Sequence, residues 1–258
     1  MRLIVPRFPL VLLAAVFAAC SADTTTGVQS GTPGDLSQVL AQFSLPSIAG
    51  VASGISGGAV ANVNVPVPSG CVYSASTSSF VCGAVTANGL TTTSFYMLYD
   101  ASGATQSAYD SRTTAAVRLV ADISGVLPAT ASTGSLTIRE HSDLTLSGLL
   151  GSTRIMNGTS SAQETGTLTV SGTSQPLTTS ITSTMSNVVL PANAGANAYP
   201  ASGTLTEDIT TAITGISAHI VMQLAFTGTS KVLATLTADG FVQHCTIDLS
   251  NPAALSCS

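Results

Sequence analysis

The chain has no tryptophan among its 258 residues, and only 7% of them are charged. It also lacks a basic excess, because seven Lys and Arg residues stand against twelve Asp and Glu residues. This composition provides neither the basic stripe typical of nucleic-acid-binding proteins nor the polybasic patch that draws proteins to anionic lipid. The missing tryptophan and the missing paired carboxylates also disfavour a carbohydrate-active hydrolase. Because the basic stripe is absent, we expect no nucleic-acid partner.

Motifs that hold a cofactor or a metal are missing as well. The sequence has no phosphate-binding loop, dinucleotide fingerprint, zinc motif or Gly-x-Ser-x-Gly elbow. Its three histidines, His141, His219 and His244, lie far apart, and none has ligand spacing to another. The sequence thus predicts no cofactor, no metal site and no catalytic residue.

Apolar runs of membrane-spanning length, about 20 residues, are also absent. A shorter run, Leu10 to Val16, follows Arg2 and Arg7, and this is the pattern of a secretory signal segment. The next four residues, Phe17-Ala18-Ala19-Cys20, resemble a bacterial lipobox, although phenylalanine stands where leucine is usual. We predict a signal peptide over residues 1–19 and lipidation at Cys20.

Lipidation of Cys20 would make the membrane a partner of this chain. Several acyl chains on one cysteine give stable anchoring, whereas a single chain binds only marginally. The residue after the cysteine is Ser21 and not aspartate. In diderm bacteria this resembles the default pattern of lipoproteins that are sent to the outer membrane. The predicted location is therefore the bacterial cell envelope, lipid-anchored, in the outer membrane. The alternative is a plain secreted protein that is cleaved after Ala19 and carries Cys20 as a free thiol.

Removal of the signal peptide leaves five basic groups against twelve acidic ones, a net charge near −7. Residues 20–34 are small, polar and without apolar periodicity, which predicts a flexible tether behind the anchor. Asp35 is a residue type that is favoured at helix N-caps, and apolar residues then recur at helical spacing until Pro46, which is expected to end the helix. We predict one short N-terminal helix there and a single β-rich domain over residues 35–258.

Four cysteines remain beyond Cys20, an even number in an exported chain. If residues 71–74 and 79–82 pair as antiparallel strands, Cys71 lies opposite Cys82 and within disulfide reach. The same folding about Asn251-Pro252 brings Cys245 opposite Cys257. We predict these two disulfides. Metal binding is the alternative, and the absence of close Cys-x-x-Cys spacing disfavours it.

From Ala61 onward, apolar residues alternate with threonine and serine in runs separated by turn residues. Asn88-Gly89 is a strong hairpin signal, and the aromatic-rich stretch Leu90 to Tyr99 is predicted to be a central strand. Ile181, Met185 and Val189 are predicted to share one face of another strand. No helix is long enough for βαβ crossovers, so the predicted class is all-β. We expect an antiparallel meander of about a dozen strands that forms a curved sheet, a sandwich or an incomplete barrel.

Several short motifs are spread over most of residues 70–249. They are Gly70-Cys71-Val72-Tyr73, Phe80-Val81-Cys82, Asn88-Gly89-Leu90, Leu98-Tyr99-Asp100-Ala101-Ser102-Gly103, Asn157-Gly158-Thr159, Tyr199-Pro200-Ala201-Ser202-Gly203-Thr204 and Thr246-Ile247-Asp248-Leu249. In these motifs the chain resembles predicted bacterial lipoproteins of unknown function. The resemblance implies a β-rich lipoprotein, and it carries no assigned activity or site.

The most polar stretch of the chain is Arg139-Glu140-His141-Ser142-Asp143. On a strand, Arg139, His141 and Asp143 share one face, while Glu140 and Ser142 point to the other. A His–Asp pair at this spacing can orient an imidazole for general-base catalysis. A solvated polar patch is the favoured interpretation, because antiparallel sheets commonly turn one polar face to water.

Glu207 and its neighbour Asp208 are predicted to lie on opposite faces of a strand, so they cannot work as paired carboxylates. Glu207 has the same parity as apolar neighbours and is therefore predicted to point inward. A buried charge needs a partner, and we expect Arg139, Arg154 or Lys231 to supply it.

Three classes of function remain. The favoured hypothesis is a lipid-anchored, non-enzymatic envelope protein whose sheet is a scaffold or an interaction surface for another envelope protein. The alternative is a carrier or receptor that holds lipid or another hydrophobic ligand on an apolar concave face. A hydrolase is the least favoured, and it would require His141, Asp143 and a hydroxyl to converge.

Overall fold

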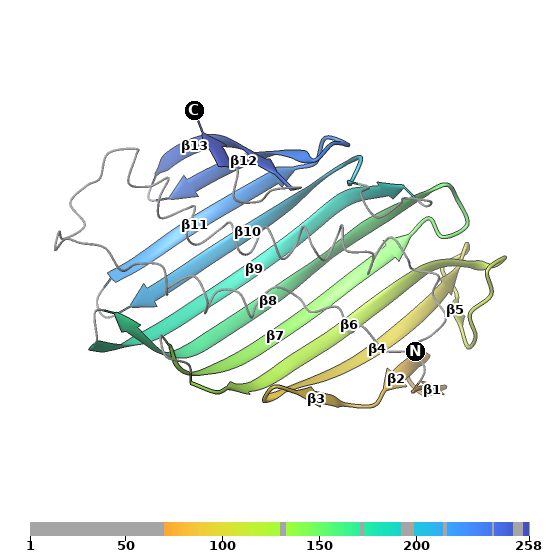
Figure 1. Ribbon diagram of the computed structural model, residues 1–258. Helices are drawn as coiled ribbons and strands as arrows, with labels where there is room; N and C mark the ends of the chain where they lie inside the picture. The colour runs from red at the N-terminus through yellow and green to blue at the C-terminus, as the bar shows by residue number, and fades with distance from the viewer. Residues whose placement is uncertain are drawn as a thin grey trace.

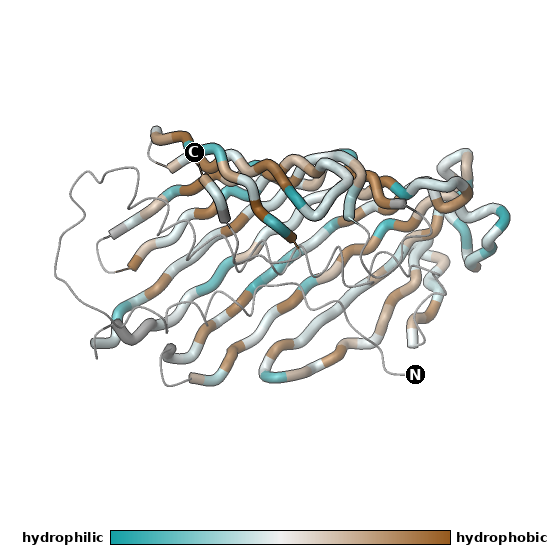
Figure 2. The backbone as a smooth tube through the Cα atoms, turned by 45° about the horizontal axis from the view of Figure 1, so that its top comes forward, coloured by the Kyte–Doolittle hydropathy of each residue, from teal (hydrophilic) through white to brown (hydrophobic). Residues whose placement is uncertain are grey.

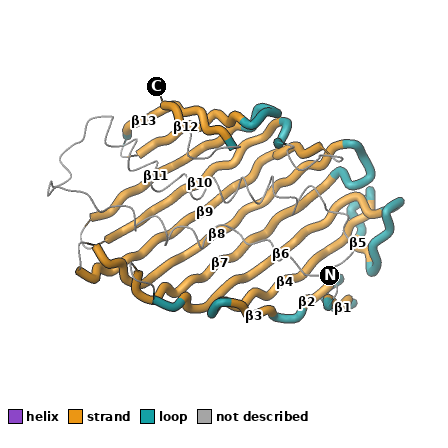
Figure 3. The backbone as a smooth tube through the Cα atoms, viewed as in Figure 1, coloured by secondary structure: helices purple, strands orange, loops and turns teal. Residues whose placement is uncertain are grey.

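A computed structural model describes residues 70–129, 133–170, 173–191, 199–213, 216–238, 240–249 and 255–257. These residues form fourteen strands of one antiparallel sheet and no helix (Figures 1 and 3). The strands are β1 (Cys71–Ser74), β2 (Ser79–Cys82), β3 (Val85–Ala87), β4 (Leu90–Asp100), β5 (Thr105–Gln106), β6 (Thr114–Leu127), β7 (Thr133–Ser147), β8 (Thr153–Val170), β9 (Thr173–Pro191), β10 (Ser202–Ile213), β11 (Ile216–Ala225), β12 (Lys231–Ala238), β13 (Phe241–Asp248) and β14 (Leu255–Cys257). The predicted signal peptide, Cys20, tether and N-terminal helix lie outside the described residues.

The sheet is a meander, because strands that follow one another in the chain lie side by side. Its order is β1-β2-β4-β6-β7-β8-β9-β10-β11-β12-β13-β14, and the short strands β3 and β5 pair with β4 beside β2. β1 and β14 lie at opposite edges, so the sheet is open (Figure 1). At the C-terminal end, β12 and β13 turn out of the plane of the central strands (Figures 1 and 2). The predicted all-β meander is confirmed, as a single bent sheet.

Period-2 alternation gives the sheet two unlike faces, visible as alternating brown and pale segments in Figure 2. The apolar face carries Leu98, Ile138, Leu205, Met222 and Ile247, all at most 2% exposed. We call the opposite side the polar face, which carries Arg118, His141 and Thr182 and is largely exposed in the central strands. Burial of one face, at about 25 cal/mol per Å² of apolar area, fixes the register, since a slip by one residue would exchange the faces.

The two predicted disulfides are confirmed, and each fixes one edge of the sheet. Cys71 pairs with Cys82 across β1 and β2, and Cys245 pairs with Cys257 across β13 and β14. The Cα atoms of each pair are 4.0 Å apart, the close approach of directly opposed residues. Exposed edges are where sheets recruit foreign strands, and here each edge strand is covalently held to its neighbour.

A β-bulge overturns part of the expected pattern in β9. Ile181 and Met185 have the predicted orientation, but the register shifts between Met156 and Gly158 on β8. Asn187 of β9 takes a positive φ of 50°, which adds one residue on this side of the ladder. As a result, Val188 is fully buried on the apolar face, and Val189 does not share the face of Ile181.

The aromatic strand β4 is not central, contrary to expectation. Its inner side pairs with β6 along nearly its whole length, but its outer side is covered only by the short strands β3, β2 and β5. The hairpin before it is as predicted, with positive φ angles of 54° at Asn88 and 82° at Gly89. The aromatic density of this stretch therefore did not mark a central strand, and its Phe95, Tyr96 and Tyr99 side chains are only partly buried.

Candidate functional site

The polar face holds the residues of the predicted polar stretch. Arg139, His141 and Asp143 project from β7 on this face, and the buried Glu140 and Ser142 lie on the apolar face, as predicted. Alternation along one strand is sufficient for this separation. The partners of these side chains, however, come from other strands.

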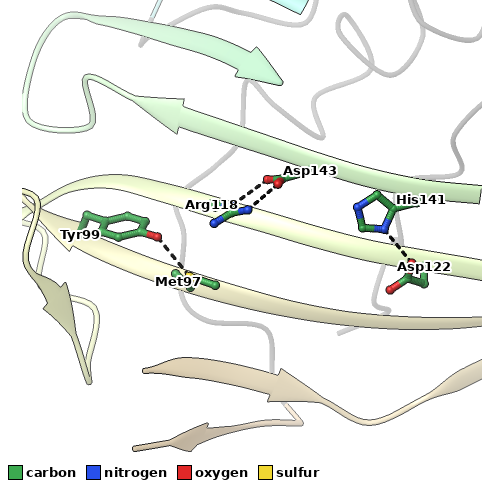
Figure 4. Close-up of polar contacts among 6 residues, drawn as sticks. All are labelled: Met97, Tyr99, Arg118, Asp122, His141 and Asp143. Carbon is green, nitrogen blue, oxygen red and sulfur yellow. Dashed lines mark hydrogen bonds and ion pairs between the residues drawn. The ribbon is translucent and has the colours of Figure 1, made fainter. Parts of the chain in front are cut away.

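Asp143 is bound by an arginine, not by the neighbouring histidine. Arg118 of β6 donates from Nε to Asp143 Oδ1 at 2.7 Å, and its terminal nitrogen binds Oδ2 (Figure 4). This two-pronged hydrogen bond lowers the pKa of Asp143. The disfavoured alternative for this stretch, a general-base pair of His141 with Asp143, is therefore not formed.

His141 is oriented by a different carboxylate. Its Nδ1 lies 2.8 Å from Oδ1 of Asp122, the residue directly opposite it on β6 (Figure 4). Both side chains are about half exposed, at 52% and 59%. A similar pair recurs on β10 and β11, where His219 Nε2 lies 2.9 Å from Asp208 Oδ1. In both pairs a carboxylate holds the imidazole ring at the surface of the sheet.

A groove of about 420 Å³ lies beside the first of these pairs. Its side chains are Asp122 and Ser124 from β6, Arg139 and His141 from β7, Ser161 and Gln163 from β8, and Ser180 and Thr182 from β9. Ser161 lies in the middle of these residues, opposite His141 on one side and Thr182 on the other, and we call this position the floor of the groove. The other lining residues, Ile123, Glu140 and Ala162, alternate to the apolar face, so they contribute main-chain atoms.

The groove brings a serine next to the Asp–His pair without forming a hydrolytic triad. Asp122, His141 and Ser161 are directly opposed on β6, β7 and β8, but among the described residues no hydrogen bond links His141 to Ser161. β8 pairs with a strand on each side at Ser161, so its backbone N–H groups are engaged in the sheet. They cannot point at a developing oxyanion.

The apolar face contains all three glutamates of the chain, and each is buried. Glu140, Glu164 and Glu207 are 8%, 2% and 3% exposed. Burial raises the pKa of each to about 7, and the nearby charge of Glu140 adds to the shift of Glu164. Glu140 and Glu164 are diagonal neighbours on β7 and β8, because Glu140 lies opposite Ala162.

The inward orientation predicted for Glu207 is confirmed, but its expected cationic partner is wrong. Arg139 and Lys231 alternate to the polar face. Arg154 shares the apolar face, yet in the described part of the chain its Nε has no partner, and neither has one oxygen of Glu207. Glu207 is instead hydrogen-bonded to the hydroxyl of Ser183, directly opposite it on β9.

Sequence reasoning missed Asp122, Arg118 and Glu164. The face on which Asp122 and Arg118 lie follows from alternation along β6, but their partners depend on how β6 aligns with β7. Glu164 could have been found from its parity with Ala162, which is buried beside it. Burial could therefore be predicted from the sequence of one strand, whereas the pairing of side chains depends on how separate strands align.

No group of three or more His, Cys, Asp or Glu residues in the described part of the chain could hold a metal ion. No helix within the described ranges is long and apolar enough to cross a membrane. Searches against family models, curated proteins and solved structures find no match to this chain.

Proposed function

We propose that this chain is a lipid-anchored protein of the bacterial cell envelope whose sheet is a non-enzymatic interaction domain. The observation that carries the proposal is the polar face, where exposed hydroxyl, amide and ionisable side chains extend from β6 to β11 and those of β6 to β9 line a groove. Two disulfides are compatible with an oxidising compartment outside the cytoplasm. The lipobox-like sequence at Cys20 supplies the anchor, with the outer membrane as the proposed site.

The interaction surface is testable in cells. A photoreactive amino acid replaces Thr184, an exposed residue of the polar face on β9, and in a control it replaces Ser76, exposed in the turn between β1 and β2. We expect a discrete, light-dependent adduct from position 184 and none from position 76. The same pattern from both positions, or no adduct from position 184, would contradict an interaction role for this face.

The anchor has its own test. Mass spectrometry of the mature chain should find acyl groups on residue 20, and the Cys20→Ser variant should leave the membrane fraction. An unmodified Cys20 in wild-type protein would reject the lipoprotein assignment and favour the secreted alternative.

A carrier of hydrophobic ligands remains the second candidate, favoured by the extent of the apolar face from β4 to β13. Native mass spectrometry of protein purified from its membrane tests this role. Co-purified lipid would support it. A lipid-free protein that also fails to take up an acyl probe would remove it.

A further inference from the structure

We infer that the groove on the polar face binds an acidic saccharide, with Arg139 receiving the carboxylate or sulfate of the sugar. The inference rests on the proposed interaction role and names the ligand class of that face. It is carried by one guanidinium that is unpaired among the described residues, one oriented Asp–His pair and a set of polar side chains on the face that carries the groove.

Arg139 is the anion-binding group of the groove. It lies directly between Ser124 on β6 and Gln163 on β8, its side chain is exposed, and it forms no ion pair or hydrogen bond among the described residues. The nearby Arg118 differs, because Asp143 already occupies it. A free guanidinium offers a planar fork that matches the two oxygens of a carboxylate or sulfate.

Asp122 and His141 provide the hydroxyl-binding side of the groove. Asp122 uses Oδ1 to accept from His141, and its Oδ2 has no hydrogen bond to any residue that the structure describes, while the ring of His141 is held with Nε2 away from Asp122. Arg139 and His141 are two residues apart on β7, a separation of roughly 7 Å along a strand. One sugar unit can therefore reach Arg139 with its acidic group and Asp122 with a ring hydroxyl.

The remaining lining favours a ligand that is polar throughout. Ser124, Ser161, Ser180 and Thr182 present hydroxyls that both donate and accept, and Gln163 adds an amide. Apolar side chains among the lining residues alternate to the opposite face. An acyl chain or an apolar peptide side chain would cover these hydroxyl and amide groups without pairing them, whereas the hydroxyls of a saccharide would find partners and its ring carbons could contact the aliphatic parts of the lining side chains.

Calorimetric titration with trigalacturonate tests the inference, with neutral galactotriose and inorganic sulfate as comparison ligands. Arg139→Gln removes the charge and keeps a polar side chain. Arg112→Gln is the matched control, since Arg112 is an exposed arginine in the turn before β6, outside the groove. A third variant, Ser161→Phe, fills the floor from an exposed position that tolerates large side chains in a strand.

We expect trigalacturonate to bind wild type and R112Q equally, and R139Q at least about tenfold more weakly. S161F should bind it at least as weakly as R139Q. No binding of trigalacturonate, or equal binding of galactotriose, would overturn the assignment of an acidic ligand. Binding of sulfate as tight as that of trigalacturonate would overturn the assignment of a saccharide ligand.

Failure of this inference is distinguishable from failure of the proposed function. Discrete adducts from Thr184 without trigalacturonate binding would reject the saccharide and keep the interaction role. Binding that depends on Arg139, without an adduct from Thr184, would keep the groove as a site and reject an interaction role for the wider face.

Discussion

Ionisation of the three buried glutamates should make this protein less stable at about pH 8 than at about pH 4.5. Burial raises the pKa of Glu140, Glu164 and Glu207 to about 7 from the usual 4.5. When a folded-state pKa is raised, the associated stability is fully present below the unfolded pKa and is lost as the pH rises through the folded one. The loss therefore develops between about pH 4.5 and pH 7.

The neighbours of each carboxylate on the apolar face explain the direction. Glu140 lies between Ile123 and Ala162, and Glu164 lies between Ile138 and Thr179. Glu207 lies between Ser183 and Met222. None of these neighbours is cationic, so the ionised forms lose water without gaining a counter-charge.

The magnitude follows from the size of the shift. A difference between pKa values of about 7 and 4.5 corresponds to roughly 3 kcal/mol for each glutamate. Typical domains are stable by only about 5–15 kcal/mol, so even one group is measurable. Glu140 contributes to the shift of Glu164, and the two losses are therefore not additive.

Urea denaturation of the oxidised protein, followed by far-UV circular dichroism because tryptophan is absent, measures the effect. Glu164→Gln should raise the free energy of unfolding by roughly 3 kcal/mol at about pH 8 and leave it nearly unchanged at about pH 4.5. Asp208→Asn, at an exposed carboxylate of the polar face, is the control and should change either value by less than about 1 kcal/mol. Equal gains for E164Q at both pH values, or a wild type equally stable at both, would refute the reasoning.

Three further changes probe the sheet itself. Replacing both Cys245 and Cys257 with serine should cost about 3 kcal/mol, because the disulfide spans 12 residues, and calorimetric melting that is unchanged would contradict this. Gly158→Ala should destabilise the protein by roughly 1–3 kcal/mol, since the φ of Gly158 is +152° and the new Cβ would lie 2.2 Å from the carbonyl oxygen of Asp143. Gly151→Ala is the control: its new Cβ would meet nothing closer than 3.6 Å, so this variant should be neutral in the same urea titration. Arg118→Met should cost less than about 1 kcal/mol, because its ion pair with Asp143 is partly exposed, and a loss above about 2 kcal/mol at high salt would show that burial dominates there.

Much of the fold could be predicted locally. Asn88-Gly89 was enough to place the hairpin of β3 and β4, and folding residues 71–82 and 245–257 about their turns was enough to place two disulfides in their observed register. The buried sides of β10, β11 and β12 also follow from alternation, because a strand has a fixed period of two. The bulge at Asn187 escaped this reasoning, since one added residue reverses the parity of everything after it.

The sequence by itself determined the all-β class, the two cross-strand disulfides and which side chains share a face along the regular part of a strand, because each depends on spacing along one strand or hairpin. Only the tertiary structure decided the rest. The pairing of β6 with β7 placed Asp122 beside His141 and Arg118 beside Asp143. The pairing of β7, β8 and β9 formed the groove around Arg139, which has no partner among the described residues. It also decided that, within the described strands, no cationic residue lies directly opposite any of the three buried glutamates. The alignment of separate strands sets these contacts, and no single strand carries that information.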